Sequence, residues 1–150
     1  MAQLPLTEEL YEAYRQTIYQ VTLPHGPFEL RVDTRHPRFD EAVRIHNART
    51  WGFISAENPL SRKTEPDINE ANHARLLQAL AALGHLVFPA WGVPQGNDWT
   101  PEKSLCAFGI HADSLRTLGL QFGQNAVVWG ETGHPARMLW CHAAPPEHPP

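Results

Sequence analysis

Residues 67–83 carry the longest regular pattern in this 150-residue chain, and that pattern is helical. Asp67 and Glu70, three residues apart, match a capping box, and Gly84 follows as a residue suited to end a helix. We therefore expect one helix over 67–83. A helix of this length needs an apolar surface to pack on, and the short apolar runs around it can supply a sheet.

The buried stripe of this helix contains polar residues as well as apolar ones. Leu76, Leu80 and Leu83 fall at helical spacing and are predicted to face the core. Tracing the stripe back by steps of four and three residues reaches Asn72 and Asn69. The sequence thus predicts two asparagine amides on the core-facing side of the first turns.

The remaining patterns predict a single α+β domain over residues 1–141. It would contain a mixed β-sheet of about five or six strands with helices packed on it. Further helices are predicted over 7–18, 40–46 and 112–122, and strands over 28–32, 51–56, 86–91, 104–110, 125–129 and 136–140. Residues 142–150 are rich in proline and are predicted to form a disordered tail.

Composition narrows the class of protein. A content of 42% apolar and 19% charged residues is typical of a globular chain and argues against disorder. The net charge of −4, with no clustered basic stripe, argues against nucleic-acid binding. No apolar run approaches the roughly 20 residues that span a bilayer, and no signal peptide is recognisable. Cys106 and Cys141 lie in apolar contexts, so we expect reduced thiols in a cytoplasmic protein.

Polar residues at the ends of predicted elements mark where a ligand site would lie. Two interpretations remain open, because such residues either line a pocket or form turns and caps that satisfy the local backbone. A buried amide needs partners, and these can come from the protein or from a ligand. The candidate ligand-binding residues are Asn58, Ser61, Asn69, Asn72, Trp99 and Gln124.

Glu102 is the candidate for acid or base chemistry. It follows a turn-rich loop, and Trp99 lies three residues before it, so an indole wall could raise its pKa by desolvation. The alternative is a solvated loop glutamate beside Lys103. The nine histidines show no spacing typical of a metal site, and no phosphate-binding motif occurs. We therefore expect neither a metal nor a cofactor.

Four motifs in order resemble the DUF3293 family, a bacterial domain of unknown function. They are Ser55 to Ser61, Asn69 with Leu76, Trp99 to Leu105, and Phe122 to Val127. The resemblance extends over about residues 11–130. Members often carry an aromatic residue where this chain has Glu57. The resemblance implies no established activity, only positions of interest.

The sequence therefore predicts a domain that binds a small polar metabolite in a polar pocket at the strand ends, with catalysis possible through Glu102. A different class is also open: a protein–protein interaction module that uses the loop Gly92–Pro101, flanked by Trp91 and Trp99. A homodimer through the edge of the C-terminal hairpin is a third possibility.

Overall fold

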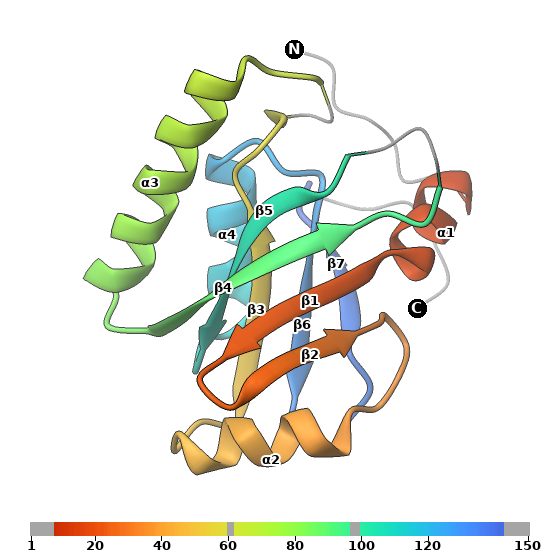
Figure 1. Ribbon diagram of the computed structural model, residues 1–150, viewed down its shortest axis with the longest axis vertical. Helices are drawn as coiled ribbons and strands as arrows, with labels where there is room; N and C mark the ends of the chain where they lie inside the picture. Colours follow the sequence, from red (N-terminus) through yellow and green to blue (C-terminus); the bar gives the residue numbers. More distant parts are fainter. Residues whose placement is uncertain (1–7, 60–61, 97–99, 143–150) are drawn as a thin grey trace.

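The computed structural model of the chain describes residues 8–59, 62–96 and 100–142. In these residues four helices pack on one seven-stranded sheet (Figure 1). The helices are α1 (Glu8–Gln16), α2 (Pro37–Ile45), α3 (Pro66–Ala82) and α4 (Ala112–Gln121). The strands are β1 (Ile18–Leu23), β2 (Gly26–Leu30), β3 (Thr50–Ser55), β4 (Leu86–Val93), β5 (Glu102–Phe108), β6 (Ala126–Glu131) and β7 (Arg137–Trp140).

The α+β class is confirmed, but the sheet differs from the prediction in two respects. It has seven strands rather than five or six, and it is antiparallel throughout rather than mixed, in the order β2-β1-β4-β5-β3-β6-β7. The strand absent from the prediction is β1, because the predicted helix extends to Ile18 whereas α1 ends at Gln16. Buried Tyr19, Val21 and Leu23 alternate with less buried residues, and this period of two is typical of a strand.

The unit β3-α3-β4-β5-α4-β6 forms the centre of the fold. Its strands lie in the order β4-β5-β3-β6, so each helix joins two strands of the same direction that have one antiparallel strand between them. This is a ferredoxin-like, split βαβ arrangement. Both helices cover one face of the sheet, because Leu76 and Leu80 of α3 share an apolar cluster with Leu115 and Leu118 of α4.

The opposite face is covered by the first hairpin of the sheet and by α2. A second apolar cluster joins β1, β2 and α2 to β3, β5 and β6, with the rings of Phe39 and Trp51 edge to face at 5.3 Å. The sheet curls so far that its two ends meet. The Asp33 amide donates to the Ala136 carbonyl at 2.7 Å, and the Ala136 amide donates to the Thr34 carbonyl at 3.0 Å.

Helix α3 differs from the prediction at its first turn and in its buried stripe. It begins at Pro66 after the N-cap residue Glu65, with no side-chain cap hydrogen bond, so Asp67 lies inside the first turn and the predicted capping box does not form. The buried residues are Asn69, His73, Leu76 and Leu80. Leu83 is the C-cap residue and is 57% exposed, because the helix ends at Ala82 and the chain turns away there.

Two further predictions concern the thiols and the membrane. Cys106 and Cys141 are both free and buried, as expected, and burial raises the pKa of the Cys141 thiol to about 12. Within the described residues, no helix combines the length and the apolar composition that crossing a bilayer requires.

One end of the sheet collects most of the polar residues that the sequence singles out. Because neighbouring strands are antiparallel, the last residues of β3 and β4 lie beside the first residues of β1, β5 and β6. Helix α1 leads directly into β1 and lies at this same end (Figure 1). We call this group of residues the polar sheet end: Glu57, Asn58, Asn69, Glu102 and Gln124.

Candidate functional site

The register of β3 and β5 brings the two central residues of the polar sheet end together. Ser55, the last residue of β3, is paired with Ser104 of β5. Asn58 lies three residues beyond Ser55, and Glu102 lies two residues before Ser104, so the antiparallel pairing carries both to the same edge. Their side chains meet there, with Asn58 Nδ2 donating to Glu102 Oε2 at 2.9 Å.

Asn58 is fixed by contacts on both ends of its amide. Its Oδ1 accepts from the Thr64 backbone amide at 3.0 Å and from Asn69 Nδ2 at 3.1 Å. Its backbone has a φ of +48°, a left-handed conformation that asparagine tolerates better than most residues. The side chain is therefore positioned before any ligand arrives.

Asn69 holds the same loop from the side of α3. Its Oδ1 accepts from the Asn58 backbone amide at 2.9 Å, and its Nδ2 also donates to the Thr64 carbonyl at 3.3 Å. The Asn69 side chain is buried, and a buried amide without hydrogen-bond partners would destabilise the fold. These partners satisfy its oxygen and nitrogen. Asn69 thus anchors Asn58 and Thr64 to the first turns of the helix.

Glu102 is the carboxylate at the centre of the site. It is half-buried, and burial raises its pKa above the ordinary value. The hydrogen bond from Asn58 lowers the pKa, while the nearby Glu57 raises it. Among the ion pairs of the described residues, none joins Glu102 to a lysine or an arginine. Within the described parts of the chain, the carboxylate therefore has a neutral partner and no cation.

Glu57 and Gln124 join the neighbouring segments. The Lys103 backbone amide donates to Glu57 Oε1 at 3.2 Å, and burial raises the pKa of Glu57 against the lowering effect of Lys103. Gln124 Nε2 donates to the Glu57 carbonyl at 3.1 Å and to the Phe122 carbonyl at 3.2 Å. Gln124 thus ties the end of α4 to the loop that follows β3.

The other candidate residues are not part of this network. Asn72 is half-buried on the flank of α3, where its Oδ1 accepts from the Arg75 guanidinium at 2.6 Å. Ser61 and Trp99 lie outside the described residues, and so does the indole wall predicted for Glu102.

Tyr14 and His73 are two further neighbours of the site, and the sequence placed only His73 near it. Burial raises the pKa of the Tyr14 phenol, and the Glu102 carboxylate raises it further. His73 follows Asn69 by one helical turn, is buried, and its Nδ1 has no partner in the described part of the chain. His73 lies between Asn69 and Leu76 in the predicted helix, and this position indicates that it is near the site. Tyr14 could only be found once the docking of α1 was known.

The predicted tail begins with a residue that packs in the core. His142 is buried, and its Nε2 lies 2.9 Å from Asn125 Oδ1, with Trp140 edge to face at 5.3 Å. Residues 143–150, the remainder of the predicted tail, lie outside the described residues.

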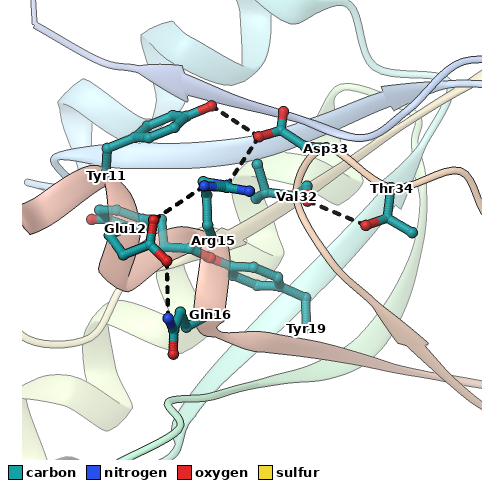
Figure 2. Close-up of polar contacts among 9 residues, drawn as sticks. Tyr11, Glu12, Arg15, Gln16, Tyr19, Val32, Asp33 and Thr34 are labelled. Atoms are coloured by element: carbon teal, nitrogen blue, oxygen red, sulfur yellow. Dashed lines mark hydrogen bonds and ion pairs between the residues drawn. The ribbon is translucent and has the colours of Figure 1, made fainter. Parts of the chain in front are cut away.

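A second polar cluster lies between α1 and the segment after β2 (Figure 2). Asp33 Oδ2 accepts from the Tyr11 hydroxyl at 3.0 Å and lies 3.3 Å from Arg15 Nε. Arg15 also pairs with Glu12 at 3.1 Å. These side chains are about half exposed, so the cluster holds α1 in place with contacts that water competes for.

The chemistry of the polar sheet end follows from its side chains. In the described residues, no group of three or more histidine, cysteine, aspartate or glutamate side chains is arranged to hold a metal ion. What the site offers is a carboxylate that takes up a proton more readily than a solvated glutamate, held by a fixed amide. Such a group can accept hydrogen bonds, pair with a cation or transfer a proton.

Comparison with known proteins gives a family match. A family model described as "Protein of unknown function (DUF3293)" matches residues 54–127. Neither a curated protein nor a solved structure matches the chain. The matched segment runs from the end of β3 into β6 and contains every residue of the polar sheet end.

Proposed function

The chain belongs to the DUF3293 family of proteins of unknown function, and from the chemistry of its polar sheet end we propose that it binds a small polar metabolite there. Glu102 is the main contact in this proposal, and Asn58 is the residue that orients it. Gln124 and Asn69 hold the loop that carries Asn58.

The observation that supports this proposal is the state of Glu102. A carboxylate that is partly withdrawn from water costs free energy unless a cation or several donors compensate it. Here Asn58 supplies one side-chain hydrogen bond, which lowers the pKa of Glu102. Burial raises the pKa by more, so the net shift is upward. Groups with this combination of burial and incomplete compensation concentrate at functional sites. A ligand that donates to Glu102 would complete the set of partners.

Catalysis is compatible with the same arrangement. Burial brings the pKa of the Glu102 carboxyl closer to neutral pH. A carboxyl group with such a pKa can both accept and return a proton. In that role Glu102 would be the general acid or base, and Asn58 a positioning residue that acts through it. The reaction class stays open in this proposal.

A thermal-shift screen tests the proposal directly. The wild type and Glu102→Gln are screened against nucleotides, sugars, amino acids, amines and divalent metals. A ligand at one hundred times its dissociation constant adds about 2.7 kcal/mol, which corresponds to a shift of roughly 5–10 °C for a chain of this length. We expect a ligand whose shift is lost in Glu102→Gln and kept in Glu41→Gln, the same change at an exposed glutamate of α2. Equal shifts in all three proteins would place the ligand elsewhere.

A protein–protein interaction module is the second candidate, and the exposure of Trp91 favours it. The indole is 42% exposed on β4, and this strand extends through Val93, so the first two residues of the loop predicted over Gly92–Pro101 belong to the sheet. Tryptophan is among the residues that contribute most to protein interfaces, so an exposed one can anchor a partner. Trp99, the second anchor of this hypothesis, lies outside the described residues.

Iodide quenching of tryptophan fluorescence discriminates this candidate. Trp91→Phe should remove a quenchable component that the wild type shows, whereas Trp51→Phe, at a buried position, should not. If a binding partner then protects the Trp91 component from iodide, the interaction module gains support. If Trp91→Phe loses no quenchable component, the exposed-anchor hypothesis fails.

A further inference from the structure

We infer that the ligand of the polar sheet end is an organic cation, with an ammonium group paired to Glu102 and a carbon chain lying over Gly92. This inference rests on the proposed function, because it names the chemical class that the same site would take. It follows from three features on the inner face of the curled sheet: a cross-strand row, a position without a side chain, and a set of aromatic rings.

The row consists of Tyr19, Gly92 and Glu102. Tyr19 of β1 is paired with Gly92 of β4, and Gly92 is paired with Glu102 of β5. Directly opposite residues of antiparallel strands project their side chains to the same face. Glu102 and Tyr19 therefore stand on either side of a strand position that contributes no side chain.

Gly92 leaves room at this position. It is buried, yet a Cβ built on it would meet only the Phe53 ring among the described residues, at 3.8 Å to Cζ and 3.9 Å to Cε1. These are ordinary van der Waals distances, so a methyl group fits without displacing any of these neighbours. Among the described residues, there is thus room for at least one carbon atom at the strand position paired with Glu102.

Two aromatic residues, Phe53 and Tyr19, lie beside this position. Phe53 and Tyr19 meet edge to face with their centroids 4.8 Å apart. The Tyr19 hydroxyl donates to the Tyr14 carbonyl at 3.0 Å, which brings the last turn of α1 to the same place. Aromatic rings attract cations and also accept hydrocarbon chains.

The carboxylate selects the charge of the ligand. A neutral ligand can donate hydrogen bonds to Glu102 but brings no opposite charge, and an anion would add repulsion from both Glu102 and Glu57. An ammonium or amidinium group supplies a cation and hydrogen-bond donors together. An organic cation is therefore the class that matches both the carboxylate and the rings around it.

The test titrates n-butylammonium into the ¹⁵N-labelled protein and follows amide chemical shifts, with 1-butanol as the neutral isostere. We expect saturable shifts at Gly92 and Glu102 with n-butylammonium and an at least tenfold weaker response to 1-butanol. Glu102→Gln should weaken n-butylammonium binding at least tenfold, whereas Glu41→Gln, at an exposed glutamate of α2, should leave it unchanged. Binding should also weaken as the pH falls through the pKa of Glu102.

Gly92→Ala provides the sharpest variant, because its added methyl group fits the fold and occupies the proposed ligand space. It should keep the melting temperature of the wild type and lose n-butylammonium binding, while Gly96→Ala, with open space around it, keeps both. Equal binding of n-butylammonium and 1-butanol, or unchanged n-butylammonium binding in Gly92→Ala, overturns the inference. A neutral metabolite that needs Glu102 would also overturn it but leave the proposed function standing. The absence of any ligand that depends on Glu102 would overturn both.

Discussion

Asn58 and Asp33 adopt similar backbone conformations in very different surroundings. Their φ angles are +48° and +65°, both in the left-handed region. Asn58 is half-buried and joins a backbone amide, a second amide side chain and a carboxylate. Asp33 is exposed, and its contacts are a tyrosine hydroxyl and an ion pair on the surface (Figure 2).

The two residues illustrate two ways in which a polar side chain can hold a fold together. At Asn58 the neighbouring groups are partly withdrawn from water, so each lost hydrogen bond leaves a polar atom without a partner. At Asp33 water replaces the lost partner at little cost, and salt screens the charge. The family match includes Asn58 and not Asp33, which lies in the segment that leads to α2.

Asn58→Ala should give the largest effect on stability. It removes the acceptor of the Thr64 and Asn69 donors and places alanine in a left-handed conformation. We expect a loss of about 2–4 kcal/mol in the free energy of unfolding, from about 1–2 kcal/mol of backbone strain plus the unpaired groups. Chemical denaturation of the two proteins measures the difference.

Asn47 supplies the matched control. Its φ is +60°, it is exposed, and its side chain makes no hydrogen bond to the described residues. Asn47→Ala should therefore show the backbone strain alone, about 1–2 kcal/mol. If the two variants lose the same stability, the network around Asn58 contributes nothing measurable and the contrast with Asp33 disappears.

Glu102→Gln should give an intermediate effect of the opposite sign. Burial raises the pKa of Glu102 in the folded protein, so its stabilising contribution is complete below the ordinary pKa of a glutamate. That contribution is lost as the pH rises through the higher pKa that Glu102 has in the folded protein. At neutral pH the ionised side chain therefore lowers the free energy of unfolding. Replacing it with glutamine should raise the melting temperature.

The pH dependence makes this prediction specific. Glu102→Gln should flatten the loss of stability between the ordinary pKa of a glutamate and the raised pKa of Glu102. A lower melting temperature for Glu102→Gln at neutral pH would show that the carboxylate is compensated in the folded protein, and that the case for a ligand is wrong.

Much of the fold could be predicted from the sequence because its signals are local. The helix over 67–83, the left-handed glycines Gly84 and Gly123, and the hairpin between β6 and β7 all follow from residues close together in the chain. Strand β1 was missed because a helical spacing that begins with Leu10 continues through Tyr14 to Ile18, and only the topology shows where the helix ends.

Four of the five residues of the polar sheet end could be picked out from the sequence, but their contacts could not. Asn58, Asn69, Glu102 and Gln124 stand out because they are polar residues at the ends of apolar elements. That Asn58 donates to Glu102 depends on a pairing between residues 44 positions apart, which no local pattern contains. The row from Tyr19 through Gly92 to Glu102 depends in the same way on the register of three strands.

Asp33→Asn should give the smallest effect and thereby complete the comparison. Asparagine tolerates the left-handed backbone and can still accept from the Tyr11 hydroxyl, so the change removes little more than the ion pair with Arg15. We expect a loss below about 0.5 kcal/mol at low salt and none at roughly 1 M salt, where the charges are screened. The cost of Asn58→Ala should not change with salt.

The pKa of Tyr11 provides a second measurement on the same variant. Burial is the largest cause of its raised pKa, and the hydrogen bond and charge of Asp33 add to it. In Asp33→Asn the pKa should fall toward the ordinary tyrosine value without reaching it, as followed by ¹³C NMR of the tyrosine rings. A salt-independent loss of stability comparable to that of Asn58→Ala would mean that Asp33 anchors α1 as firmly as Asn58 anchors its loop. The distinction between the two clusters would then rest on their chemistry and not on their exposure to water.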